Sequence, residues 1–164
     1  MFPQDDAVGA DEPYARCVPN HRALLPDGYF HVIARGIPER PIYIDDDDRR
    51  LFMVLVPRTV DLHRVTIHAL CLMSTHYHAV VEAAVVDLSN GMRRLHGQYA
   101  TRFNRRHGRF GSLFAERFVS RVIASEEYLY EACAYVLLNP VKAGLCQRME
   151  DWPWSYSRYG VENM

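Results

Sequence analysis

The chain has 164 residues, of which 49% are hydrophobic and 24% charged, and its formal net charge is −1. This length and composition predict an ordinary globular domain that can bury a hydrophobic core. No apolar run approaches the roughly 20 residues that a membrane-spanning helix needs. The first twelve residues are acidic, unlike a signal peptide, so we expect a cytoplasmic protein. Its four scattered cysteines are expected to be free thiols, with Cys71 and Cys133 in the core.

The N-terminal segment differs from the rest of the chain. Residues 1–26 contain four prolines and no sustained hydrophobic period, which predicts a loosely ordered extension. Residues 27–160 are predicted to form a single domain. Its first strand is predicted over Tyr29–Arg35, after a turn at Asp27-Gly28.

A helix is predicted over Asp45–His63, where apolar residues recur at helical spacing. Its first residues form the acidic run 45–48, which suits the positive end of the helix dipole. A metal site is the alternative explanation for this run, and the helix start accounts for it better. Pro57 is expected to kink or interrupt the helix, because proline lacks the backbone N–H that the interior needs.

Two strands are predicted next, over Val65–Met73 and His76–Ala83, separated by the short break Ser74-Thr75. A second helix over Asp87–Arg106 and a strand over Arg117–Ala124 follow. A third helix is predicted from Glu126 to about Leu138, ending at Asn139-Pro140. The aromatic tail, residues 151–157, is expected to dock on the domain.

This order of elements predicts an α+β fold. It matches a ferredoxin-like split β-α-β sandwich, in which a four-stranded antiparallel sheet carries helices on one face. The third helix is an addition to this plan and is free to lie across the sheet.

The pattern His76-Tyr77-His78 is the first candidate site. Successive side chains of a strand point to opposite faces, so the two histidines share one face and lie about 7 Å apart along the strand. Two imidazoles at this spacing can converge on one metal ion. The alternative is a strand edge that carries two solvated histidines.

The third predicted helix carries a second candidate group. Tyr135 and Asn139 are spaced i and i+4, which places them on one helix face about 6 Å apart. An amide oxygen can join two imidazoles around a cation, and a nearby tyrosine can act as a nucleophile. The alternative is that Tyr135 is a core aromatic. Tyr99 is a rival nucleophile, although its spacing with apolar neighbours predicts a core position.

Basic residues are concentrated in one stretch of the chain. Residues 92–121 contain eight arginines and a single acid, whereas residues 1–61 contain eleven acids and seven basic residues. Arginine binds phosphate through paired hydrogen bonds and stacks on bases, so the cluster predicts contact with a nucleic-acid backbone. Codon bias explains arginine in place of lysine but not the clustering, and a solvated helix face is the remaining alternative. The candidate DNA-binding residues are Arg93, Arg94, Arg102, Arg105, Arg106 and Arg109.

Five stretches in this order resemble the REP-associated tyrosine transposases, which are IS200-like members of the HUH single-strand transposases. The resemblance spans roughly residues 27–159. It is carried by Ile33–Phe52, Leu72–Val81, Phe103–Phe114, Ala134–Leu145 and Asp151–Tyr156. One departure precedes the first histidine, where Ser74-Thr75 stands in place of the usual Pro-Asn.

The resemblance implies a role for each candidate residue. His76, His78 and Asn139 match the ligands of a divalent metal, Mg²⁺ or Mn²⁺, and Tyr135 matches the nucleophile. The implied activity is cleavage and rejoining of single-stranded DNA through a 5′-phosphotyrosine intermediate, and the implied partner is single-stranded DNA that folds into a palindromic hairpin. We expect a nucleoid-associated monomer or homodimer without a membrane partner.

Two other functions stay open at this point. One is a domesticated DNA-processing nuclease with the same chemistry, which only genomic context distinguishes from a transposase. The other is a non-catalytic module that binds single-stranded nucleic acid. The presence of all four candidate residues together argues against a non-catalytic module.

Overall fold

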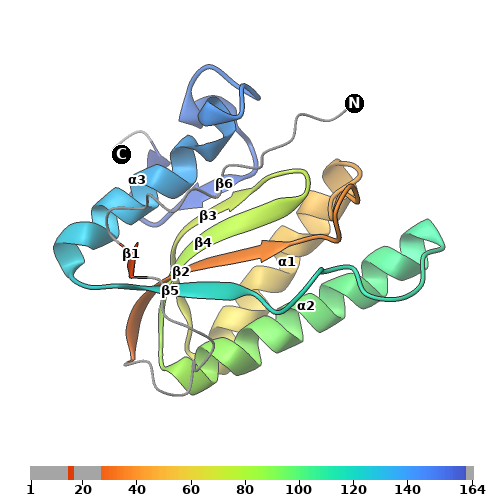
Figure 1. Ribbon diagram of the computed structural model, residues 1–164, viewed down its shortest axis with the longest axis horizontal. Coiled ribbons are helices and arrows are strands. Elements are labelled where there is room, and N and C mark those ends of the chain that lie inside the picture. The colour runs from red at the N-terminus through yellow and green to blue at the C-terminus, as the bar shows by residue number, and fades with distance from the viewer. Residues whose placement is uncertain (1–14, 17–26, 162–164) are drawn as a thin grey trace.

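The computed structural model describes residues 15–16 and 27–161. Most of the predicted N-terminal extension lies outside the described residues, and the division into residues 1–26 and 27–160 stays a prediction. In the described part, one antiparallel sheet of six strands runs in the order β1-β5-β2-β4-β3-β6 (Figure 1). The strands are β1 Ala15–Arg16, β2 Gly28–Arg35, β3 Thr66–Leu72, β4 His76–Ala83, β5 Val119–Ile123 and β6 Ser155–Ser157.

The four central strands confirm the predicted fold class. Their order β5-β2-β4-β3 is that of a split β-α-β sandwich, in which the first and third of these four strands, β2 and β4, lie in the middle. The edge strands β1 and β6 were not predicted. They have two and three residues, too few to show the alternation by which a strand is recognised.

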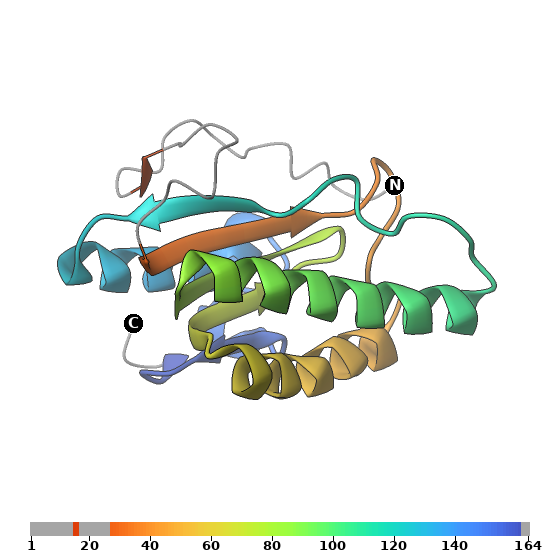
Figure 2. The ribbon, with the colours of Figure 1, turned by 90° about the horizontal axis from the view of Figure 1, so that it is seen from below.

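Three helices cover the sheet: α1 Asp46–His63, α2 Val85–His107 and α3 Glu126–Lys142. Helices α1 and α2 lie side by side against one face, and α2 extends beyond the sheet (Figures 1 and 2). They share a core cluster with Phe30, Leu70 and Tyr77 from the central strands. Helix α3 packs on the opposite face, where its Val136 joins a second cluster with Val80. No helix in the described residues has the length and apolar character to span a membrane.

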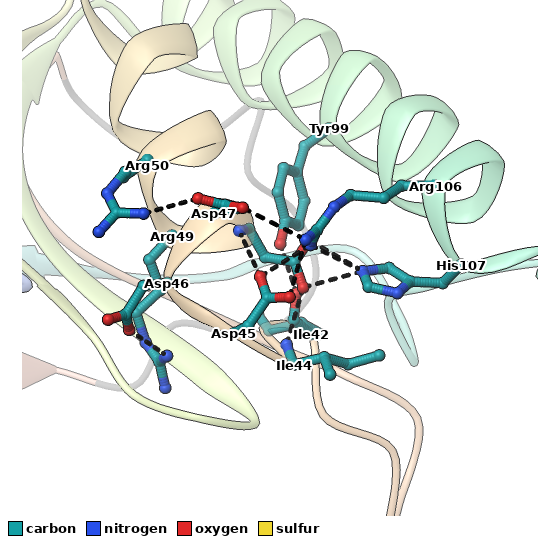
Figure 3. A network of polar contacts seen from close by, with 11 residues as sticks. Ile42, Ile44, Asp45, Asp46, Asp47, Arg49, Arg50, Tyr99, Arg106 and His107 are labelled. Atoms are coloured by element: carbon teal, nitrogen blue, oxygen red, sulfur yellow. Dashed lines mark hydrogen bonds and ion pairs between the residues drawn. The ribbon is translucent and has the colours of Figure 1, made fainter.

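An ion-pair cluster joins the start of α1 to the end of α2 (Figure 3). Asp45 is the N-cap of α1 and accepts a hydrogen bond from the Asp48 backbone N–H, which confirms that the acidic run begins a helix. Arg106 donates through Nη1 to Asp45 and to the buried Asp48, each at 2.7 Å, and His107 Nε2 lies 2.9 Å from Asp48 Oδ1. The hydrogen bond from Arg106 lowers the pKa of Asp45 to about 2.

Two prolines lie inside helices, Pro57 in α1 and Pro140 in α3. Pro57 was expected to kink or interrupt α1, and the helix continues through it without interruption. Buried residues on both sides of the proline, Leu55 and Thr59, hold the helix to its neighbours, and such packing outweighs local propensity. Helix α3 likewise continues through Pro140 to Lys142, one turn beyond the predicted end.

The aromatic C-terminal tail docks on β3, as predicted. Strand β6 pairs with β3, the Leu72 backbone N–H donates to the Trp154 carbonyl, and Trp152 Nε1 donates to the Leu72 carbonyl. Cys71 and Cys133 are buried free thiols, as expected.

Replacing Asp48 with alanine removes a fully buried acceptor of the Ile44 backbone N–H, the Arg106 guanidinium and the His107 ring. We expect the free energy of unfolding in urea to fall by roughly 2–4 kcal/mol, because buried donors lose their acceptor. Asp46→Ala is the matched control. Asp46 lies on the same turn, is exposed and pairs with Arg49. Its replacement should therefore lower the free energy of unfolding by no more than about 0.5 kcal/mol. Equal losses in the two variants would contradict a structural role for the cluster.

Candidate active site

Strand β4 carries His76 and His78 on the sheet face that α3 covers. The rings lie 5.0 Å apart between centroids, and the residues are only 4% and 2% exposed. Tyr77 points the other way, into the core beneath α2, where its hydroxyl lies 2.7 Å from His96 Nε2. The structure therefore confirms the predicted shared face of the two histidines, and it excludes the alternative of a solvated pair.

Hydrogen bonds hold the Nδ1 atom of each imidazole. His76 Nδ1 lies 3.1 Å from the Thr75 hydroxyl, and His78 Nδ1 lies 3.0 Å from His31 Nε2. Thr75 is itself positioned by its carbonyl, which accepts from the Gly36 backbone N–H. Because each Nδ1 has a partner, the Nε2 atom is the one that each ring can offer to a ligand. A metal-binding histidine is commonly oriented in this way by a bond to its other nitrogen.

His31 belongs to this site, although no motif in the sequence points to it. It is fully buried on β2, its ring stacks on His78 at 5.2 Å, and it meets the Tyr135 ring edge-on at 6.0 Å. Strand β2 pairs with β4 so that Ile33 lies opposite His78, which makes His31 a diagonal neighbour of His78. Alternation along the sequence does indicate that His31, Ile33 and Arg35 share one face of their strand. It does not give the register of β2 against β4, which is needed to place His31 beside His78.

Helix α3 brings Tyr135 to the histidines. The Tyr135 ring lies 6.5 Å from the His78 ring between centroids, and Lys142 Nζ lies 4.1 Å from the centre of the Tyr135 ring. The residue is half-buried at the edge of the α3 core cluster. The predicted nucleophile and one predicted metal ligand are thus neighbours in space, 57 positions apart in the chain.

Asn139 lies within α3, not at the helix end where it was predicted. Pro140 has no backbone N–H, so the Val136 carbonyl loses the donor that it would otherwise have in the helix. Asn139 Nδ2 replaces that donor at 3.2 Å and also reaches the Tyr135 carbonyl at 2.9 Å. The amide nitrogen is therefore held against the helix, and the carbonyl oxygen is the atom that the side chain can offer to a ligand.

The surroundings of the histidines are basic. Arg35 is directly opposite His76 in the β2–β4 pairing, and Arg121 is opposite His31 in the β2–β5 pairing. Burial, together with the charge of Arg35, lowers the pKa of His76 to about 4. Burial and then the neighbouring His31 lower the pKa of His78 well below its ordinary value. Both imidazoles are therefore neutral near pH 7, the form that can bind a metal ion.

The six candidate DNA-binding arginines lie on α2 and the loop after it, in different settings. Arg94, Arg102 and Arg105 are exposed. Arg93 donates to Asn90 Oδ1, and the Arg109 guanidinium lies 5.5 Å from the centre of the Phe103 ring. Arg106 is engaged in the ion-pair cluster with the start of α1, a structural role that the sequence did not indicate.

Comparison with known families shows where the chain belongs. The family described as IS200-like transposase matches residues 25–137, which is more than half of the chain, so the protein belongs to this family of transposases. The match includes His76, His78 and Tyr135 and ends two residues before Asn139.

Among solved structures, the fold resembles that of a REP-associated tyrosine transposase bound to a REP hairpin. The TM-score is 0.64 at 19% sequence identity, and the alignment covers 80% of this chain and 77% of the other. A comparison with curated proteins finds no match.

Proposed function

We propose that this protein is a metal-dependent transposase that cleaves and rejoins single-stranded DNA at hairpin ends, with Tyr135 as the nucleophile. The observation that carries the proposal is the position of Tyr135, whose ring lies within 6.5 Å of His31 and His78 on the face that also holds His76. Membership in a transposase family supports it. The hairpin bound to the structurally similar transposase supports the proposed substrate.

The donor set fits a divalent cation. His76 and His78 are neutral and offer Nε2, and Asn139 offers its carbonyl oxygen, so these three residues would hold the metal. Within the described residues, no group of three or more His, Cys, Asp or Glu is placed to hold a metal ion, and the proposal takes the Asn139 amide oxygen as the third ligand. When bound, Mg²⁺ or Mn²⁺ supplies positive charge to a non-bridging phosphate oxygen.

Tyr135 makes the covalent bond in the proposed reaction. Its hydroxyl oxygen attacks phosphorus, the bond from phosphorus to the DNA 3′ oxygen breaks, and the departing strand retains a 3′-hydroxyl that carries the proton lost by tyrosine. The 5′-phosphate stays on Tyr135, which conserves the energy of the phosphodiester, and attack by a 3′-hydroxyl reverses the step. Lys142 lies over the Tyr135 ring and Arg35 is opposite His76, so both would supply positive charge near a phosphate that Tyr135 attacks.

His31 has a positioning role in this scheme. Its bond to His78 Nδ1 holds the imidazole with Nε2 directed to the ligand side, and its ring packs against the edge of Tyr135. One buried side chain therefore contacts both a proposed metal ligand and the proposed nucleophile.

Changing Tyr135 to phenylalanine removes only the nucleophilic oxygen, so the fold should survive while covalent attachment disappears. The measurement is the amount of protein that migrates with a labelled single-stranded hairpin after denaturation, in the presence of Mn²⁺. Tyr128→Phe is the matched control, because Tyr128 is an exposed tyrosine of the same helix. If Tyr135→Phe still forms the adduct and Tyr99→Phe loses it, the nucleophile is on α2 and the proposal is wrong.

Alanine at His76, His78 or Asn139 should reduce the rate of cleavage by at least about a hundredfold. Even the residues that only hydrogen-bond to metal ligands lower metal affinity or activity by roughly 10–100-fold when they are replaced. Binding of the same hairpin without metal should change less than threefold (roughly 0.7 kcal/mol), since the ligands serve the chemistry. Cleavage is measured with Mg²⁺, Mn²⁺ and Zn²⁺ in parallel, because imidazole alone favours zinc. Parallel losses of binding and cleavage would indicate that these side chains contact DNA or support the fold.

The exposed arginines of α2 provide a test of DNA contact that is independent of catalysis. The logarithm of affinity for single strands falls with the logarithm of salt concentration by about 0.7 per phosphate neutralised. Replacing Arg102 and Arg105 with alanine should therefore flatten the slope by about 1.4. Arg40→Ala with Arg58→Ala removes the same charge from exposed positions outside α2 and should leave the slope unchanged. A slope that stays unchanged when Arg102 and Arg105 are replaced would exclude these residues of α2 from the DNA path.

A further inference from the structure

A second polar cluster centred on a histidine lies on the sheet face that α3 covers, away from the proposed metal ligands. His68 of β3 is 5% exposed, and its Nδ1 lies 2.6 Å from the Tyr159 hydroxyl and its Nε2 lies 3.4 Å from Glu82 Oε2. Glu82 shares the α3 side of β4 with His78, because four positions separate them, about 13 Å along the strand. The proposed chemistry at Tyr135 assigns no role to this cluster.

A β-bulge sets the position of His68. The register of β3 against β4 shifts between Ile67 and Ala69, which leaves His68 outside the paired positions. The His68 carbonyl instead accepts from the backbone N–H of Arg158, just beyond β6, at 2.9 Å. A bulge re-aims the side chain of its extra residue and is frequent next to active sites. The chain thus interrupts a central pairing to turn an imidazole toward its own C-terminal tail.

The hydrogen bonds of His68 have a defined direction. A carboxylate at Glu82 can only accept, so Nε2 carries the hydrogen. Burial lowers the pKa of His68, so the imidazole is neutral near pH 7 and its Nδ1 is an acceptor. The Tyr159 hydroxyl therefore donates to Nδ1. Both ring nitrogens are satisfied, and a buried network of this kind specifies one arrangement of its members.

Two series of contacts lead from His68 to the first turns of α3, which lies next to the tail (Figure 1). The Tyr159 ring stacks on the His68 ring with centroids 5.8 Å apart, and it lies 4.9 Å from the ring of Tyr130. The Tyr29 ring meets His68 edge-on at 5.5 Å, and its hydroxyl donates to Glu126 Oε1 at 3.4 Å. Both series reach α3 on the N-terminal side of the proposed nucleophile.

The same helix carries these contacts and Tyr135. Tyr130 and Tyr135 are five residues apart, which is about 7.5 Å along the helix axis. A displacement of the first turns of α3 therefore moves the Tyr135 hydroxyl relative to the histidines of β4. A reacting atom misplaced by about 1 Å can cost on the order of a hundredfold in rate.

From these contacts we propose that His68 is a positioning residue, which through Tyr159 fixes the first turns of α3 and so places the Tyr135 hydroxyl for attack. The inference rests on the proposed function, because it takes Tyr135 as the nucleophile. The docked tail then supports the covalent step in addition to covering the edge of β3.

The test separates the covalent step from binding. Tyr159→Phe removes only the hydroxyl that donates to His68, and Tyr156→Phe is the matched control, because Tyr156 is an exposed tyrosine of the same tail. In Tyr159→Phe, the rate of adduct formation with Mn²⁺ at saturating hairpin should fall roughly tenfold, the effect of a displacement smaller than 1 Å. The Kd of the same hairpin without metal should change less than about twofold, because the cluster lies away from the metal ligands. Tyr156→Phe should leave both quantities unchanged.

A double variant tests whether His68 acts through Tyr159. His68→Ala should slow adduct formation at least as much as Tyr159→Phe does. Adding Tyr159→Phe to His68→Ala should cause no further loss, because the two side chains act through one contact. Losses that multiply in the double variant would contradict the proposed link.

Hydrogen exchange tests the link to α3 without catalysis and in the mildest variant. Backbone amides of residues 130–134 should exchange at least about threefold faster in Tyr159→Phe, while those of α1 keep their rates. Exchange and adduct rates that match those of Tyr156→Phe would overturn the proposal. A faster adduct rate in Tyr159→Phe would also overturn it, because the tail would then restrain the nucleophile. If the unaltered protein forms no adduct, the proposed function fails, and with it the role of His68 in placing a nucleophile, while hydrogen exchange still decides whether His68 and Tyr159 hold α3.

Discussion

Strand β4 contributes to both faces of the sheet, and the position of the proposed active site depends on this constraint. Because side chains alternate, Tyr77 is committed to the core beneath α2, while His76 and His78 must face α3. A shift of one residue in register would exchange the two faces, burying the imidazoles among apolar side chains and removing Tyr77 from the core. The packing of Tyr77 thus holds the two histidines beneath the helix that carries Tyr135.

Electrostatic contacts have different roles in different parts of the molecule. The net charge of −1 conceals an acidic first part of the chain and a basic later part. The structure joins the two at Asp48 and Arg106, where opposite charges connect the start of α1 to the end of α2. Around His76 and His78 the charge is positive instead, from Arg35 and Arg121 on the neighbouring strands. An electropositive site with neutral imidazoles suits an anionic substrate such as a phosphodiester.

Much of this arrangement could be predicted from the sequence. The alternation of β4, the helix start at the acidic run and the order of the main helices and strands along the chain follow from local patterns, and the structure confirms them. Tyr99 was predicted to be a core residue, and its ring is fully buried with its hydroxyl donating to the Ile42 carbonyl. These features could be predicted because each depends on residues close together in the sequence.

Features that depend on distant pairs could not be predicted. The contact of His31 with His78 requires the register of β2 against β4, and the ion pair of Arg106 with Asp48 joins residues 58 positions apart. The end of α3 was predicted too early because Asn-Pro ordinarily stops a helix. Here the Asn139 side chain supplies the donor that Pro140 lacks, so the helix continues for another turn.

The central claim is that the oxygen of Tyr135 becomes covalently bound to DNA. The most direct measurement is mass spectrometry of the peptide to which DNA remains attached, after reaction with a single-stranded hairpin and Mn²⁺ followed by protease and nuclease digestion. We predict a peptide that includes Tyr135 from α3 and carries a nucleotide through its 5′ phosphate on that tyrosine. A nucleotide on another tyrosine, or a cleaved strand with no protein attached, would contradict it.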